Sequence, residues 1–312
     1  MKGGEAMLSR KTILPMLLVL FLCGCNDIND ISEPPESEAV SKTYTSEPQK
    51  PDGYPVEVNG IKFSAPPEKA AVLTPAAAEM IFEMGFGENV AVCGSLCDYP
   101  EAAAKLSKAG SAAAPDTELI LSFSPDIVIT ESPISPDDEA ALRNGGAEVM
   151  TLSVPENHTE LYNEYLSLAE IFAGSDAKIY ADRAMSDYYH ETSASADMGS
   201  FLLIMNDNFS VATGDTLAGE LFSNFGENIA ENYSNYYMPE SDAVNADPDV
   251  IFLSEDIDRD SFASAHKNLK AVKSNNVYRI DTSLFERPTA RLSETARQVH
   301  DIAEKLSAES GE

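Results

Sequence analysis

The chain has 312 residues, of which 43% are hydrophobic, and its formal net charge is −31. This length suffices for one large domain or two lobes, and the apolar content excludes a chain that is disordered throughout. The acidic balance excludes nucleic acid as a partner, because phosphates would repel such a surface.

The first 24 residues have the order of a signal peptide. Lys2, Arg10 and Lys11 precede an apolar run at 13–22, and small residues follow that run. This order is typical of secretory signals, and the run is shorter than the roughly 20 residues that a transmembrane helix needs. We therefore expect residues 1–24 to be removed and the protein to act outside the cytoplasm.

The signal ends in Leu22-Cys23-Gly24-Cys25, which resembles a bacterial lipobox. The resemblance implies cleavage before Cys25 and attachment of lipid to it, which would hold the protein on the outer face of the bacterial cell membrane. An ordinary secretory signal is the alternative. Residues 25–56 are rich in proline and acids, and we expect them to form an extended tether.

Short β-type runs alternate with helical stretches from residue 57 onward, which favours parallel βα units. In residues 57–156 we expect strands at 70–73, 90–93, 126–130 and 148–152, with helices at 76–84, 117–123 and 138–144. In residues 199–312 we expect strands at 201–205, 250–253 and 277–280, with helices at 217–224 and 289–306. Residues 157–198 between them follow helical spacing. The prediction is an α/β fold of two lobes with mainly parallel sheets, joined by a long helical span.

Two phrases occur twice in the chain. FGENVA at 86–91 returns as FGENIA at 225–230, and PDIVI at 125–129 returns as PDVIF at 248–252. Two repeats in the same order indicate two lobes with the same succession of helix, turn and strand. A helix is predicted to end at each Phe-Gly, with Gly87 or Gly226 as its left-handed cap.

Cys93 and Cys97 are the cysteines that remain after the lipobox. An extended segment would hold their Cα atoms roughly 13 Å apart, whereas a turn at Gly94-Ser95 would bring them within the distance of about 7 Å that a disulfide needs. Both states stay open. The histidines are His158, His190, His266 and His300. None of them follows a predicted strand or has metal-ligand spacing with a cysteine, so we expect no metal site and no cofactor.

Several segments resemble class III solute-binding proteins of ABC importers, the group that serves cobalamin and iron chelates. They are VLTPAAAEMIFEMGFGENVAVCGSLCDYP (72–100), DTELILSFSPDIVIT (116–130), LKAVKSNNVYRID (269–281) and FERPTARL (285–292). The resemblance spans roughly residues 60–306, and its CDYP and FER motifs lean towards the cobalamin-binding branch. It implies two α/β lobes joined by a long helix, with the ligand held in a cleft between them.

The resemblance also implies a function and partners. It describes a monomeric, non-enzymatic lipoprotein that captures cobalamin or an iron-siderophore complex and delivers it to a membrane permease with its ATPase. The chain has no tryptophan, whereas the cobalamin branch lines its cleft with several, and Glu131 stands where one is expected. Tyrosine and phenylalanine take their place, or the ligand is a siderophore, a haem or a variant corrinoid.

Strand ends supply the candidate ligand-binding residues, since ligands sit beyond the carboxyl ends of parallel strands. They are Thr74, Pro75, Asp98, Tyr99 and Glu131 in the first lobe, and Asn206, Phe209, Tyr236, Tyr237, Phe285 and Arg287 in the second. The resemblance places Tyr99, with its apolar face and polar tip, against ligand. It gives Arg287 the same role, with a salt bridge to Glu286 or another acid as the alternative. Arg291 matches a family arginine that we expect to be structural.

The resemblance further implies one glutamate on each lobe that pairs with arginines of the permease. Glu118 matches the first, and Glu220 is the acid nearest to the second. Exposed charges of this kind orient a partner, whereas a plain solvated helix face is the alternative.

Two other classes of protein stay open. An extracytoplasmic enzyme would use Cys97 or a serine as its nucleophile, but no histidine is placed as its base and the chain has no G-x-S-x-G motif. A structural surface lipoprotein would need neither a cleft nor a permease. Direct binding of a free metal ion is a further alternative, which the scattered histidines disfavour.

Overall fold

The computed structural model describes residues 52–193 and 196–310. The predicted signal peptide at 1–24, the lipidation site Cys25 and the tether up to residue 51 lie outside the described residues. Within the described part, no helix is both long enough and apolar enough to cross a membrane.

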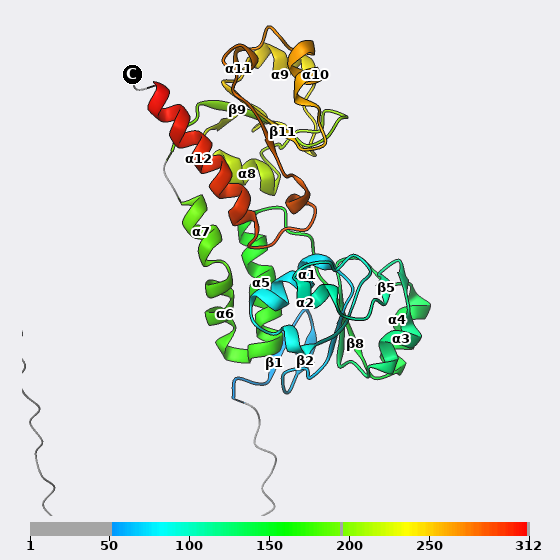
Figure 1. Ribbon diagram of the computed structural model, residues 1–312. Helices are drawn as coiled ribbons and strands as arrows, with labels where there is room; N and C mark the ends of the chain where they lie inside the picture. Colours follow the sequence, from blue (N-terminus) through cyan, green and yellow to red (C-terminus); the bar gives the residue numbers. More distant parts are fainter. Residues whose placement is uncertain (1–51, 194–195, 311–312) are drawn as a thin grey trace, which may run out of the picture. The chain divides into compact units, whose positions relative to one another are not determined.

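Two four-stranded parallel sheets form the framework of the fold (Figure 1). The N-terminal sheet has the order β4-β3-β7-β8, with β3 at Ala70–Val72, β4 at Val90–Cys93, β7 at Ile127–Thr130 and β8 at Glu148–Thr151. The C-terminal sheet has the order β10-β9-β11-β12, with β9 at Ser200–Ile204, β10 at Glu227–Asn228, β11 at Val250–Ser254 and β12 at Val277–Ile280. The predicted α/β fold with mainly parallel sheets is confirmed.

The two sheets share one topology. In each, the first strand along the chain pairs with the second strand at one edge and with the third on its other side. FGENVA includes the first two residues of β4 and FGENIA contains β10, while the second repeated phrase supplies β7 and β11. The repeated phrases therefore mark equivalent places in two equivalent sheets.

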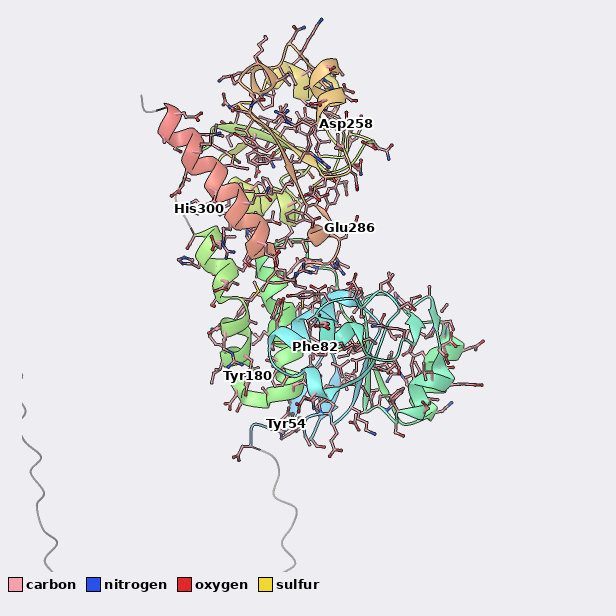
Figure 2. All side chains as sticks on the ribbon, in the orientation of Figure 1. Tyr54, Phe82, Tyr180, Asp258, Glu286 and His300 are labelled. Atoms are coloured by element: carbon pink, nitrogen blue, oxygen red, sulfur yellow. The ribbon has the colours of Figure 1, made fainter. Side chains whose placement is uncertain are left out.

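The role predicted for the glycines of this phrase was wrong. Neither Gly87 nor Gly226 has a positive φ, and the left-handed residue after the first helix is Gly85, at φ 91°. A Cβ on Gly87 would lie 2.3 Å from the ring of Phe82, which Figure 2 labels. A Cβ on Gly226 would lie 2.4 Å from the carbonyl oxygen of Gly199. Close approach of neighbouring atoms, rather than helix capping, requires glycine at both places.

Helices connect the strands of each lobe. Around the N-terminal sheet they are α1 (Pro75–Glu83), α2 (Glu101–Ala104), α3 (Thr117–Ser122) and α4 (Pro136–Asn144), with the 3-10 turn η1 (Gly87–Asn89). Around the C-terminal sheet they are α8 (Leu217–Ser223), α9 (Glu240–Ala246), α10 (Arg259–Ala265), α11 (Lys270–Lys273) and α12 (Leu292–Ser310), with the 3-10 turn η3 (Ser283–Phe285). Two antiparallel pairs complete the fold: β1 (Val56–Val58) with β2 (Ile61–Phe63), and β5 (Gly110–Ser111) with β6 (Ala114–Pro115).

The span between the lobes consists of successive helices rather than one. They are α5 (His158–Ala173), the 3-10 turn η2 (Gly174–Asp176), α6 (Ala177–Ala184) and α7 (Ser186–Thr192). The helical spacing of Leu161, Tyr165, Leu168 and Phe172 gives α5 a buried face, as that spacing predicts. Helix α5 contacts α1 of the first lobe and α8 of the second, and α12 runs beside α7 (Figure 1). The span therefore supports both lobes.

The folded part begins earlier than the sequence indicates. Residues 52–56 belong to the predicted tether, yet Gly53 accepts a hydrogen bond from the Ser175 amide at 3.1 Å. The hydroxyl of Tyr54, labelled in Figure 2, donates to the Ile171 carbonyl at 2.7 Å. Burial raises the pKa of Tyr54 to about 12. These contacts attach the segment to the end of α5.

Cys93 and Cys97 are both buried and both free. A hydrogen bond between the two thiols lowers the pKa of Cys93, and the same bond together with burial raises the pKa of Cys97. A buried neutral thiol is a poor nucleophile, so the position of Cys97 does not favour the enzyme alternative.

Candidate ligand-binding site

A first hollow lies at the carboxyl ends of β3 and β7. This N-terminal hollow has a volume of about 240 Å³ and is lined by Leu73, Thr74, Pro75, Ser111, Ala112, Ala113, Thr130, Glu131 and Ser132. Three of the predicted residues, Thr74, Pro75 and Glu131, are therefore brought together. The sequence did not predict the contribution of residues 111–113, which form the turn between two very short strands.

A second hollow lies at the carboxyl ends of β9, β11 and β12. This C-terminal hollow has a volume of about 470 Å³ and is lined by Met205, Asn206, Ser210, Tyr236, Asp256, Thr282, Ser283, Phe285 and Glu286. It unites the predicted residues Asn206, Tyr236 and Phe285. Glu286, labelled in Figure 2, lines it next to Phe285.

Three predicted residues of the second lobe do not line this hollow: Phe209, Tyr237 and Arg287. Phe209 is partly buried and packs against the apolar cluster on one side of the C-terminal sheet. Tyr237 is 67% exposed. The strand-end rule selects the right loops but cannot say which side chain of a loop turns inward.

The other predicted residues, Asp98, Tyr99 and Arg287, meet where the two lobes touch. An Nη1 of Arg287, in the loop before α12, donates to Oδ1 of Asp98 at 2.6 Å, although Asp98 lies in the loop after β4. This hydrogen bond lowers the pKa of Asp98. The same Nη1 lies 3.5 Å from Oε1 of Glu79 in α1. The alternative to ligand contact was a salt bridge of Arg287 with Glu286 or another acid. The structure contains such a salt bridge, and its acids are Asp98 and Glu79.

Arg291 joins the same cluster from the start of α12. Its Nη1 donates to Oε2 of Glu79 at 3.2 Å, and its guanidinium carbon lies 4.1 Å from the centroid of the Tyr99 ring. A cation over an aromatic ring is attracted by the negative electrostatic potential of the ring face. Arg291 therefore holds both the buried acid and the exposed tyrosine.

Glu79 is the residue that the sequence reasoning missed. Its side chain is completely buried. Burial raises the pKa of Glu79, and the hydrogen bond and charge of Arg291, followed by the charge of Arg287, oppose that rise. A signal was available, because Glu79 is the one acid in the run from Ala76 to Ile81, on the apolar side of the helix.

A second contact attaches the loop before α12 to the first lobe. The hydroxyl of Tyr165 in α5 accepts a hydrogen bond from the Ala290 amide at 2.7 Å and donates to Oε2 of Glu83. Burial raises the pKa of Glu83 to about 7 and also raises the pKa of Tyr165. The segment 287–291 of the second lobe is therefore bound to α1 and α5 of the first.

A third hollow lies where the chain leaves β8 for α5. This linker hollow has a volume of about 480 Å³ and is lined by Asn59, Leu152, Ser153, Val154, Pro155, Glu156, Glu160, Asn163, Glu164 and Ser167. Glu164 is 7% exposed, and its Oε1 is buried without a hydrogen-bond partner. Burial raises the pKa of Glu164 to about 8, and the nearby charge of Glu131 adds to that rise.

The two glutamates expected to meet a permease lie in different surroundings. Glu118, in the first turn of α3, is exposed. Glu220, in the first turn of α8, accepts a hydrogen bond from the His158 amide at 2.8 Å and so caps the start of α5. Its carboxylate lies 3.9 Å from Nε2 of the same histidine. Glu220 thus has a structural task that Glu118 lacks.

Within residues 52–193 and 196–310, no group of three or more histidine, cysteine, aspartate or glutamate side chains is arranged to hold a metal ion. The hollows are lined by polar and acidic groups without imidazole or thiolate ligands.

The two lobes with parallel sheets are those of a known protein family. The sequence pattern of that family, described as periplasmic binding protein, matches residues 71–284. The chain belongs to the periplasmic binding protein family. This family consists of solute-binding proteins.

Relatives of this periplasmic binding protein match over most of their length. An uncharacterised ABC transporter substrate-binding lipoprotein of Bacillus subtilis, YvrC, is 23% identical over 93% of this chain and 94% of its own. A vitamin B12-binding protein of Vibrio parahaemolyticus is 25% identical over 72% of this chain and 86% of its own.

Solved structures share the fold. The periplasmic vitamin B12-binding protein BtuF of Vibrio cholerae superposes with a TM-score of 0.57 and 20% identity, over 77% of this chain and 98% of its own. The heme-binding protein HutB of the same species superposes with a TM-score of 0.62 and 17% identity, over 75% of this chain and 98% of its own. At these identities the likeness concerns the fold.

The buried carboxylate of Glu79 gives a first prediction. We expect Glu79→Gln to destabilise this periplasmic binding protein by about 3 kcal/mol, because Arg291 would lose its buried partner. Glu294→Gln is the matched control, since Glu294 lies 3.6 Å from the same arginine but is 59% exposed. It should cost less than about 1 kcal/mol. Urea unfolding measures both, and equal losses would contradict the assignment of Glu79 as the anchor.

The raised pKa values of Glu83 and Glu164 give a second prediction. In the folded protein Glu83 keeps its proton up to about pH 7 and Glu164 keeps its proton up to about pH 8, whereas the ordinary pKa of a glutamate is 4.5. The folded state then binds more protons than the unfolded state, so the free energy of unfolding falls as pH rises through this window.

Glu164→Gln should remove part of this fall in the free energy of unfolding, because the glutamine amide stays neutral at every pH tested. We expect the variant to be more stable than the native chain by about 2 kcal/mol at pH 8 and to lose the difference towards pH 5. Urea unfolding at pH 5, 6.5 and 8 tests this. Asp137→Asn, at an exposed position in α4, removes the same charge and should leave the slope unchanged. Parallel slopes for all three proteins would refute the prediction.

Proposed function

We propose that this chain is the substrate-binding lipoprotein of an ABC importer, which captures cobalamin, another corrinoid or an iron-siderophore complex between its lobes. The single observation that carries the proposal is the pair of hollows at the carboxyl ends of parallel strands, one in each lobe. Ligands of open α/β sheets bind at this end. The Asp98 and Arg287 side chains join the loops next to the two hollows, so a ligand would meet both lobes.

The proposal includes the path of the ligand. Lipid on Cys25 would hold the protein at the outer face of the cell membrane, and residues 26–51 would give it reach. Ligand binding would shift an equilibrium between open and closed lobes. The closed form would then deliver the ligand to a permease that is driven by an ATPase.

The relatives support this assignment by what their names say of them: one is an ABC transporter substrate-binding lipoprotein and others are vitamin B12-binding proteins. Heme-binding proteins share the fold, and haem is therefore the alternative ligand. The enzyme and structural alternatives have less support, because Cys97 is buried and the hollows would be without use on a structural protein.

Native mass spectrometry of the purified protein with cyanocobalamin, ferric hydroxamate siderophores and haem tests the function. We expect a one-to-one complex with a corrinoid or a siderophore at micromolar concentration, with the ligand mass unchanged. A complex with haem alone would select the alternative. If the protein binds none of the three, the proposed function fails.

The two docking glutamates give a separate prediction. Glu118→Gln should slow delivery to the cognate permease several-fold without changing the melting temperature, because Glu118 has an exposed rim charge. Glu220→Gln should slow delivery and also lower the melting temperature, because a neutral amide replaces the charged acceptor at the start of α5. Ligand uptake into vesicles and thermal unfolding measure the two effects. A Glu118→Gln protein that delivers ligand normally would exclude that residue from the docking surface.

A further inference from the structure

Two acids, Glu131 after β7 and Glu164 in α5, lie at neighbouring hollows. Glu131 lines the N-terminal hollow and Glu164 lines the linker hollow. The amide of Leu152, in the linker hollow, donates to the carbonyl of Thr130, the residue before Glu131, at 2.7 Å, so the two hollows adjoin. The charge of Glu131 adds to the rise in the pKa of Glu164. Glu164 is more than nine-tenths buried, and its Oε1 has no hydrogen-bond partner.

A buried carboxylate without a partner is costly. The described residues that line the two hollows include no lysine, arginine or histidine to offset that cost. Glu156 and Glu160 add two further acids to the linker hollow, although Oε2 of Glu160 is occupied by the Glu156 amide at 2.9 Å. An ionised Glu164 would be stabilised here by an entering group with N–H donors or positive charge.

The two arginines at the contact between the lobes are already paired with acids. Arg287 is engaged by Asp98 and Glu79, and Arg291 by Glu79. The C-terminal hollow contributes Asp256 and Glu286 and no basic residue. An anionic ligand would therefore meet like charge from both lobes, which opposes binding.

We propose that the ligand is a metal chelate of neutral or positive net charge that presents amide or ammonium N–H groups, and that Glu131 and Glu164 receive those groups. The inference rests on the proposed function and narrows its substrate class. It disfavours chelates whose periphery consists of carboxylates, including ferric citrate and haem with its two propionates.

Proton uptake follows from the same geometry. The titratable groups around Glu164 are Glu131 after β7 and Glu156 and Glu160 at the start of α5, all acidic. Burial raises the pKa of Glu131 as well as that of Glu164, so the free pair holds a proton near neutral pH. An ammonium group that enters would favour the ionised pair, and binding would release that proton.

The test uses two matched pairs of chelates. Dicyanocobinamide carries amide side chains on the corrin ring, whereas dicyanocobyrinic acid carries carboxylates on the same ring. Ferrioxamine B carries a free ammonium group, whereas its N-succinyl derivative carries a carboxylate on the same ferric hydroxamate. Isothermal titration calorimetry at pH 7, in buffers of different ionisation enthalpy, measures affinity and proton release together.

We expect the amide or ammonium member of at least one pair to bind tenfold or more tightly than its carboxylate twin. Glu131→Gln and Glu164→Gln should each weaken binding of ferrioxamine B, or reduce the preference within the corrinoid pair, by about tenfold. Asp137→Asn removes the same charge from an exposed site in the same lobe and should leave both affinities unchanged. Proton release should accompany binding of ferrioxamine B and disappear in Glu164→Gln.

The outcomes separate the two proposals. If the carboxylate member binds as tightly as its twin in every pair that binds, or if both glutamine variants keep the native preference, the inference is wrong and the transport function stands. If no chelate binds, the proposed function fails and the inference falls with it.

Discussion

The arrangement of the two lobes depends on one buried carboxylate. Glu79 lies on the apolar side of α1 with no exposed surface, and both of its neighbours of opposite charge come from the loop before α12, more than two hundred residues along the chain. Removing a charge from water costs several kcal/mol, which only close and well-placed partners offset. Arg291 supplies the closer contact and at the same time lies against Tyr99, so the position of an exposed candidate residue is set by a buried ion pair. The hydrogen bond from the Ala290 amide to Tyr165 fixes the same loop from α5.

This constraint explains the charge of the cleft. The chain has 21 lysines and arginines against 52 acids, and the two arginines nearest the cleft are consumed by the pairs that join the lobes. The hollows themselves are lined by acids: Glu131 at the end of β7, Glu164 in α5, and Asp256 and Glu286 in the second lobe. The acidity of the chain therefore extends from its outer surface into the hollows that we propose as the ligand site.

Sequence reasoning reached the sheets because their signals are local. Runs such as 127–129 and 250–253 are continuous and apolar, and buried parallel strands require that composition. The spacing of α5 is equally local. The strand-end rule then located both hollows, though it placed Phe209 and Tyr237 in a cleft that they do not line. Helices α9, α10 and α11 were missed because they are short and have weak periodicity.

Glu79 and Glu164 were missed for another reason: an acid on a buried helix face contradicts the local pattern, and only the tertiary contacts of distant segments show what it does. The prediction that Gly87 and Gly226 cap helices failed for the same reason. Their close approach to Phe82 and Gly199 depends on packing and not on the dihedral angles of the turn.

The contrast between Arg287 and Arg291 indicates how the lobes can move without separating. Asp98 has 70% of its side chain exposed, and an ion pair at such a site contributes little because water competes for both charges. In the ion pair of Arg291 with Glu79 the acid is buried, so breaking this pair costs much more free energy. When the lobes shift, the contact of Arg287 with Asp98 should therefore yield first, while Arg291 keeps the start of α12 on α1. Two arginines four residues apart thus take different roles because one acid partner is exposed and the other is buried.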